Sequence, residues 1–354
     1  METKRIKTAV RTVCTIMGLM LPLTGCSRGP AMDTDGRYIP GDMSVQINGI
    51  IVNMADYDSC AAVFSHIDGS SASLTLSNLI LGMDTAVFTC GISEERKGKY
   101  LFSGEAAMDC PERELAVEGS INEGEIRLSV TDLVTSKIAN TWTATGSGNA
   151  PDIDINFYNP DITTVDVGGL PVPVSIITAM LGPMLGGIAG EMLPFDRVRL
   201  DRIHYVEISP EPEDLPVNGV LQYYTGANDG KLHFYLRKSV CQAAGLGDKP
   251  LDKGLGYVLN SSGDSLRICV DLTEYPAIVP VLSDAISGTD YQDYLDSGAP
   301  LGDIDEALFE TYKKIVATLV EAIALPDTVF DIWIGLTPDT MGNRQQEARE
   351  NDKG

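Results

Sequence analysis

The residues most capable of chemistry in this sequence fall in two short strings of its second half. Asp201-Arg202-Ile203-His204 places a carboxylate three residues before an imidazole, and Gly263-Asp264-Ser265-Leu266 places a serine hydroxyl two residues after a glycine. A serine that is activated by a histidine, itself oriented by a carboxylate, can attack an ester carbonyl. Together the two strings could supply the nucleophile, the base and the orienting acid of an ester hydrolase.

These strings resemble the nucleophile block and the D-x-x-H block of GDSL hydrolases, but their order in the chain is reversed. In that family the serine block comes first, where a strand turns into a helix. Here Ser265 follows His204 and lies between two strand patterns, so residues 260–264 predict a hairpin turn. We therefore expect a protein that is not an enzyme and has no catalytic residue. An envelope hydrolase acting on glycans or esters is the alternative.

The residue types that usually hold metals do not form a site in the sequence. His66, His204 and His233 have neither an H-x-x-x-H spacing nor a cysteine neighbour, so zinc is not expected. The acidic strings at residues 33–36, 152–154 and 303–305 do not continue into a calcium-binding loop. No pair of carboxylates stands out as a glycosidase pair. We expect no metal and no cofactor.

The first residues of the chain predict a secretion signal. Lys4, Arg5, Lys7 and Arg11 form a basic start, and residues 13–23 are apolar but too few to cross a bilayer. The string Leu23-Thr24-Gly25-Cys26 that follows resembles the lipobox of bacterial lipoproteins. That resemblance implies cleavage before Cys26 and attachment of lipid to it, and Ser27 at the next position is compatible with sorting to the outer membrane. An ordinary secretory signal is the alternative.

Of the seven cysteines, the lipobox resemblance implies that Cys14 leaves with the signal and that Cys26 carries lipid. The compartment permits disulfides, and Cys241 with Cys269 is the pairing we consider first, because both lie near strand-like runs in one half of the chain. The alternative is that the five remaining cysteines are mainly buried small apolar residues, since none is part of a C-x-x-C motif.

Charge and length limit the possible functions further. The formal charge of −24 becomes −27 when residues 1–25, with four bases and one acid, are removed. Such a surface repels DNA and RNA, so no nucleic-acid partner is expected. The remaining length suggests two domains, and 44% hydrophobic residues are enough to fill their cores.

The first half of the chain has the alternating pattern of antiparallel strands. Residues 26–42 are small and polar and predict a tether, whereas residues 43–150 predict an N-terminal antiparallel β domain, a barrel or a sandwich. Its clearest unit is a hairpin of residues 115–121 and 125–130, in which Ile126, Leu128 and Val130 share one face. A strand around Trp142 is expected to close this domain.

The second half mixes strands with helices. Residues 151–338 predict a second β-rich domain, and the apolar residues 174–193 predict a buried, broken helix because Pro183 and several glycines interrupt them. A helix capped by Asp303 should carry Leu308, Ile315 and Leu319 on one face, and a strand should follow at residues 330–335. The polar residues 339–354 predict a tail.

This layout of lipobox, tether, strand meander, apolar helical insert and second strand set resembles the calycin-like surface lipoproteins of the Bacteroidetes. The resemblance implies a lipocalin-like barrel, which in such proteins often holds a small apolar ligand. The Gly-x-Trp of true lipocalins is absent from the first strand pattern.

The expected fold class is therefore mainly β with helical insertions (α+β). The expected function is that of a lipid-anchored, non-enzymatic ligand-binding or interaction module of the bacterial outer membrane. Its partners would be the membrane, through the lipid, and a small apolar ligand, a glycan or an envelope protein. A structural or assembly subunit of an outer-membrane complex is a further alternative.

Overall fold

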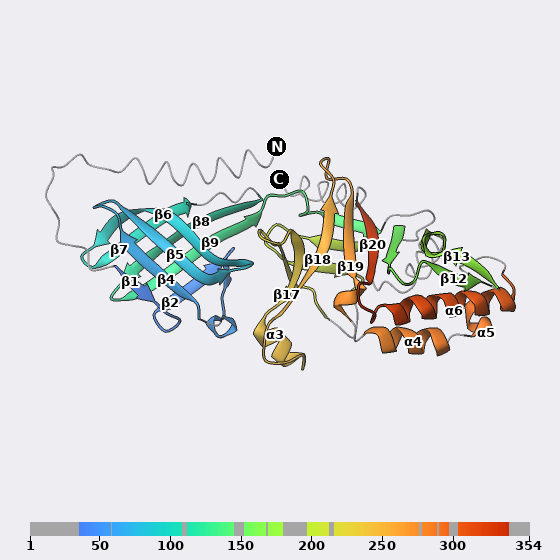
Figure 1. The fold of residues 1–354 in the computed structure, drawn as a ribbon. Coiled ribbons are helices and arrows are strands. Elements are labelled where there is room, and N and C mark those ends of the chain that lie inside the picture. The colour runs from blue at the N-terminus through green and yellow to red at the C-terminus, as the bar shows by residue number, and fades with distance from the viewer. Residues whose placement is uncertain are drawn as a thin grey trace, which may run out of the picture.

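The computed structural model describes residues 35–57, 59–107, 112–144, 152–167, 169–179, 197–211, 216–275, 278–288, 290–296 and 304–339. The signal, Cys26, most of the tether and the tail beyond residue 339 lie outside these ranges. Within them the protein is mainly β, with few helices. Figure 1 shows two β units side by side, with the longer helices at the far end of the second unit. No helix in the described part of the chain is long and apolar enough to cross a membrane.

The first unit is a nine-stranded sheet that curls into a nearly closed barrel (Figure 1). All its neighbouring strands are antiparallel except β2 and β9. In sheet order the strands are β1 (Gly36–Tyr38), β4 (Ala61–His66), β5 (Ser71–Ile80), β6 (Met83–Arg96), β7 (Lys99–Ala106), β8 (Arg113–Asn122), β9 (Glu125–Val134), β2 (Met43–Ile47) and β3 (Ile50–Ile51).

The curl follows from the connection between β1 and β2. These strands lie at or beside opposite ends of the sheet order, yet only residues 39–42 join them. A turn closed by Asp42 N–H donating to the Ile39 carbonyl (2.8 Å) makes the link, so the two ends of the sheet must come together. The interior is filled by side chains that are at most 1% exposed, including Phe64, Leu74 and Phe88.

The predicted hairpin of the first unit is confirmed. β8 and β9 pair in register, and the turn residues Glu123 and Gly124 both have positive φ, the geometry that matches the twist of a tight hairpin. Ile126, Leu128 and Val130 are buried on one face of β9, as the alternation predicted.

The second unit is a sheet built around the last strand of the chain. β20 (Val329–Pro338) pairs with β19 on one side, and with β10 and β11 on the other. The path runs β15 (Val206–Ser209), β14 (Arg197–Leu200), β10 (Thr141–Ala144), β20, β19 (Leu266–Asp271), β18 (Leu251–Leu259), β17 (Lys231–Leu236) and β16 (Gln222–Thr225), and β11 spans Asp152–Tyr158.

Trp142 corrects the predicted organisation. The strand around it was expected to close the first domain, but β10 pairs with β14 and β20 of the second sheet. The fully buried indole donates to the Ile138 carbonyl (2.9 Å) and packs among Leu200, Leu266 and Leu336. The barrel therefore ends at Val134, and β1 extends it at the other end into residues predicted as tether.

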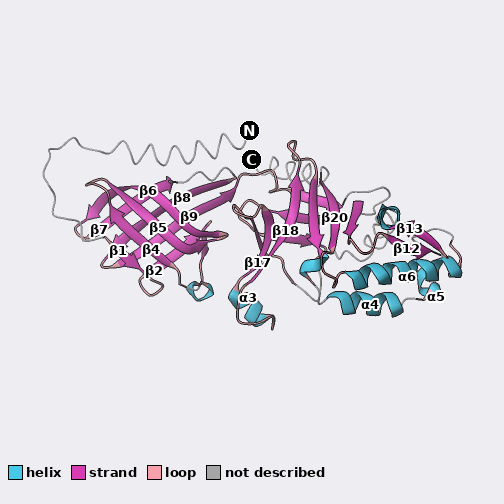
Figure 2. Ribbon diagram, viewed as in Figure 1, coloured by secondary structure: helices cyan, strands magenta, loops and turns pink. Residues whose placement is uncertain are grey.

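The longer helices, α4 (Ile278–Gly288) and α6 (Glu306–Ala322), lie at one end of the second sheet (Figure 2). The amphipathic helix α6 buries Ile315 and Leu319 as predicted, but it buries Phe309 in place of Leu308, which is 39% exposed. Asp305 caps the helix by accepting from Leu308 N–H (2.8 Å). The predicted cap, Asp303, lies outside the described residues, as does the predicted helical insert from residue 180 onward. The neighbouring elements are β12 (Thr164–Val167), β13 (Leu170–Pro173), a helical segment at residues 174–179, α4 and α5 (Tyr291–Asp296).

Candidate functional site at the junction of the two units

The two β units meet at the end of the barrel that carries the β5–β6 turn. Gly82 in this turn has φ +71°, and a Cβ there would lie 2.2 Å from the ring of Tyr224 on β16. Only glycine allows this approach. A second contact comes from Asp56 of the barrel unit, which accepts from Ser239 N–H (2.8 Å) in α3 (Lys238–Ala243). The two units are therefore in direct contact through the β5–β6 turn with β16, and through Asp56 with α3.

A buried ionic network lies at this junction. Asp132 on β9 is 1% exposed, and its carboxylate accepts from Arg113 Nε (3.0 Å) and Nη2 (2.6 Å) of β8. His204, in the turn before β15 of the second unit, places Nε2 3.0 Å from the same carboxylate. Arg113 Nη1 also donates to the Leu81 carbonyl (2.7 Å), and the Asn48 side chain bonds both backbone groups of Asp132. One carboxylate thus links an arginine of the barrel with a histidine of the second unit.

The geometry of His204 makes it a structural group. Its Nδ1 lies 3.0 Å from the Tyr223 carbonyl and its Nε2 faces Asp132, so both ring nitrogens face acceptors. Arg113 Nη2 also lies 3.4 Å from Nε2, so the ring is enclosed by groups of both units. Asp201 does not orient the ring; its carboxylate instead accepts from the N–H groups of Ile203 and Tyr205 and holds the turn in which His204 has φ 74°.

The pKa of Asp132 shows how strongly the network favours the charged form. Burial by itself would raise this pKa, but the hydrogen bond and charge of His204, together with Arg113, outweigh burial and hold it below the usual value for aspartate. A carboxylate buried here is therefore retained as an anion by its two partners.

Ser265 is part of a hairpin turn, as the sequence predicted. It follows the turn between β18 and β19, where the side-chain oxygen of Asn260 accepts from the N–H groups of Gly263 (2.9 Å), Asp264 (3.0 Å) and Ser265 (3.2 Å). In this structure the nitrogens of His204 face the Tyr223 carbonyl and Asp132, and neither is bonded to Ser265.

The other two histidines also lie beside aspartates. His233 on β17 has Asp252 2.7 Å from Nδ1 and Asp229 2.8 Å from Nε2, and its ring stacks on Tyr224 at 4.5 Å. His66 lies 2.6 Å from Asp35. In the described ranges, no group of three or more histidine, cysteine or acidic residues is arranged to hold a metal ion.

The described cysteines are buried free thiols. Cys241 lies in α3, and Cys269 lies on β19 opposite Gly256 and Trp333, so the disulfide expected between them is not formed in this structure. Burial raises the pKa of the Cys90 and Cys269 thiols to about 11, which keeps them protonated and unreactive. Cys60 is a free buried thiol as well, and Cys110 lies outside the described residues.

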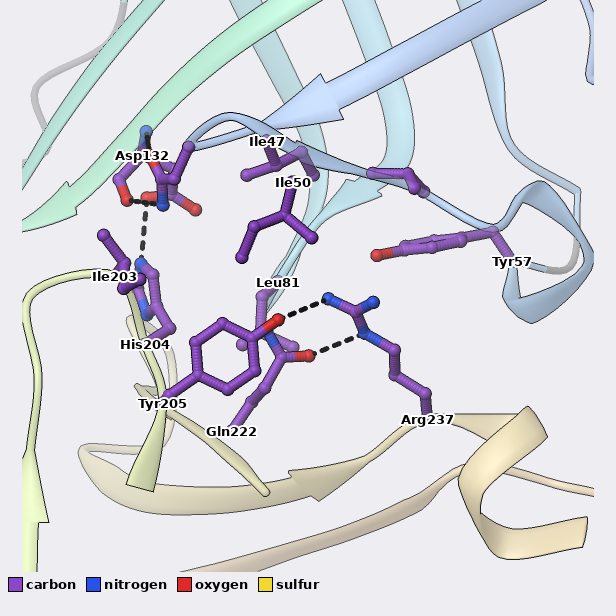
Figure 3. Close-up of a pocket in the computed structure, with 12 residues that line it drawn as sticks. Ile47, Ile50, Tyr57, Leu81, Asp132, Ile203, His204, Tyr205, Gln222 and Arg237 are labelled. Carbon is purple, nitrogen blue, oxygen red and sulfur yellow. Dashed lines mark hydrogen bonds and ion pairs between the residues drawn. The ribbon is translucent and has the colours of Figure 1, made fainter. Parts of the chain in front are cut away.

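Two cavities lie at the junction. The smaller one, of about 30 Å³, is shown in Figure 3 and is lined from the barrel side by Ile47, Ile50 and Tyr57, and from the second unit by Tyr205 and Arg237. The larger one is an open groove of about 650 Å³ between the chain that leaves the barrel and the β18–β19 hairpin. Its lining residues are Glu112, Thr135, Ser136, Lys137, Gly230, Tyr257, Val258, Leu259, Asn260 and Ser261.

Among the residues of this junction the sequence singled out His204, but as a candidate base and not as a partner of Asp132. Asp132 did leave a signal, because it continues the spacing of Ile126, Leu128 and Val130 and therefore occupies a core-facing position on β9. A charged residue on an apolar strand face needs a partner, which the structure supplies from β8 and from the second unit. No comparable pattern in the sequence marks Arg237. Its hydrogen-bond partners, Gln222 and Tyr205, are 15 and 32 residues away along the chain.

Three comparisons with known proteins find no match. No protein-family model matches the chain, and neither a curated protein nor a solved structure matches it.

Proposed function

We propose that this protein is a lipid-anchored, non-enzymatic binding protein of the bacterial outer membrane. The lipobox at residues 23–26 supports the anchor, and a lipidated cysteine with several acyl chains holds a soluble domain at a bilayer stably. The tether between Cys26 and β1 is short enough to keep the barrel near the membrane, about 30 Å at full extension.

The observation that carries the binding role is the location of the two cavities. Both are lined from the barrel side and from the second unit, whereas the barrel interior is filled with apolar side chains. Ligand sites commonly form where two domains meet. We therefore place binding at the junction, and not inside the barrel as the calycin-like resemblance would imply.

A role as an assembly subunit is the second candidate, and the barrel edge favours it. β3 ends the sheet, and its residue Ile51 is 73% exposed. An unpaired strand edge with an apolar side chain can accept a strand from a partner protein. A partner bound in this way would lie next to the smaller cavity, since Ile50 lines it.

Two experiments test the proposal. Mass spectrometry of the chain purified from membranes should find acyl groups on an amino-terminal Cys26, and a Cys26→Ser variant should keep its signal and lose the acyl mass. A thermal-shift screen of the same membrane-derived chain in detergent should find compounds that raise the melting temperature by mass action. An unmodified mature terminus would refute the anchor, and an esterase or glycosidase activity lost with a single residue would refute the non-enzymatic role.

A further inference from the structure

We propose that the smaller junction cavity binds the carboxylate group of an organic acid, with Arg237 as its main ligand. This inference rests on the proposed binding function and names the chemistry of the ligand. It is carried by three features of the cavity: a fixed guanidinium without an acidic partner, a hydroxyl that points toward it, and a size that suits a group of few atoms.

The guanidinium of Arg237 is held in place by neutral groups. Its Nε donates to Gln222 Oε1 (2.9 Å) and its Nη2 to the hydroxyl of Tyr205 (3.3 Å). Gln222 is itself 7% exposed, so its amide cannot easily move away. These bonds fix the plane of the guanidinium before any ligand arrives, which lowers the entropic cost of binding.

Arg237 has no acidic partner in the described part of the chain, although the chain has 50 acidic residues. Its Nη1 makes no hydrogen bond with any residue described there. Arginine recognises planar carboxylates through two parallel N–H donors, and the two terminal nitrogens here keep N–H groups for that purpose. The arginine therefore lacks the counter-ion that a guanidinium usually has.

Tyr57 supplies a further donor from the barrel side. Figure 3 shows its hydroxyl end directed toward the Arg237 guanidinium. Burial raises the pKa of this hydroxyl, while the charge of Arg237 opposes that rise, so the group is protonated at neutral pH. A carboxylate bound to Arg237 would thus receive donors from both units.

Size and surroundings favour a carboxylate over a larger anion. A volume of about 30 Å³ holds only a few atoms, so the cavity would take the head group while the rest of the acid extends outward. Ile47, Ile50 and Val52 form an apolar wall, which suits an aliphatic chain. Asp132 also lines the cavity, but Arg113 and His204 neutralise its charge toward an incoming anion.

The test is isothermal titration of the membrane-derived chain in detergent at constant ionic strength. The probes are acetate, hexanoate and N-acetyl-leucine, with hexanamide and N-acetyl-leucinamide as uncharged matches and with phosphate and chloride as other anions. Hexanoate and N-acetyl-leucine distinguish a simple aliphatic acid from a peptide carboxyl end. We expect binding of at least one carboxylate and at least tenfold weaker binding of its amide and of both inorganic anions.

Two site variants and one control variant test whether the carboxylate binds at Arg237. Arg237→Gln should weaken carboxylate binding at least tenfold, and Tyr57→Phe, which keeps the ring, should weaken it about threefold or more. Arg199→Gln is the charge-matched control, because Arg199 lies on the exposed surface paired with Glu207, and it should bind like the wild type. Tyr57→Phe keeps the inference testable if Arg237→Gln does not fold.

Three outcomes would overturn the inference: equal affinity for acid and amide, tighter binding of phosphate or chloride, or carboxylate binding that survives in both site variants. The failure of this inference differs from failure of the proposed function. If no carboxylate binds while another compound raises the melting temperature, only the carboxylate assignment is wrong. If no compound from any class binds, the binding function fails with it.

Discussion

Two clusters of histidine and aspartate in this protein use the same groups in opposite ways. At the junction, one buried carboxylate, Asp132, is shared by two partners, Arg113 and His204. On the second unit, two aspartates, Asp229 and Asp252, share one histidine, His233, and both aspartates are about 40% exposed or more. Water screens the second cluster, whereas the first must be neutralised by its own members.

This difference in burial indicates which cluster contributes more to the stability of the folded protein. A buried charge that loses its partner is far more costly than a surface charge, because no solvent compensates it. The junction cluster joins strands of the barrel to a turn of the second unit, so its integrity should control how the units are held together. The surface cluster joins neighbouring residues of one unit and should affect only local stability.

Asp132→Asn should have the largest effect of the changes considered. It leaves the buried guanidinium of Arg113 without its counter-charge, and the expected loss in the free energy of unfolding is about 3 to 5 kcal/mol. Urea unfolding at pH 7, followed by circular dichroism, measures it. Asp229→Asn is the matched surface change and should cost about 1 kcal/mol or less. Equal losses for the two variants would contradict the comparison.

At acidic pH the wild type and Asp132→Asn should differ less in their free energy of unfolding. The pKa of Asp132 is lowered in the folded protein, so the unfolded chain takes up the proton first as the pH falls. The stability that Asp132 contributes is therefore present above the ordinary aspartate pKa and is lost as the pH falls through the lowered value. Urea unfolding at pH 7, 5, 4 and 3 should show the gap between the two proteins narrowing only at the acidic end.

His233→Asn should show the opposite dependence on pH with a smaller amplitude. Partial burial would lower the pKa of His233, but the hydrogen bonds and charges of Asp252 and Asp229 outweigh it and raise the pKa. Its contribution is then complete below the ordinary histidine pKa and is lost as the pH rises through the raised value. Melting temperatures of wild type and variant should differ most near pH 6 and converge at alkaline pH; a gap that widens with pH would exclude this account.

The sequence predicted the barrel better than the second sheet for a topological reason. Most barrel strands pair with their neighbours in the chain, so the alternating pattern and the turn residues around Glu123 and Gly124 carry most of the information. In the second unit, β20 joins residues near 333 to residues near 154, and no local pattern encodes that pairing. The strand around Trp142 was therefore placed in the wrong unit.

The candidate site was predictable only in part. The hairpin turn before Ser265 followed from the turn residues at 260–264, which are a local property of the sequence. Asp132 could have been found from its position on the apolar face of β9, but its partner His204 is 72 residues away along the chain. The cavity at Arg237 depends on how Gln222, Tyr205 and the barrel rim approach one another, and the sequence does not encode that approach locally.

Ser265→Ala should have the smallest effect, and it tests whether His204 belongs to the structural cluster alone. The variant keeps the backbone N–H that donates to Asn260, so the free energy of unfolding should change by less than about 0.5 kcal/mol. Asn260→Ala removes the acceptor of three N–H groups in the same turn and should cost about 1 kcal/mol. Urea unfolding measures both, and a p-nitrophenyl ester assay accompanies it. If the wild type cleaved the ester and Ser265→Ala did not, His204 would have to release one of its two partners to act as a base, and its role at the junction would no longer be purely structural.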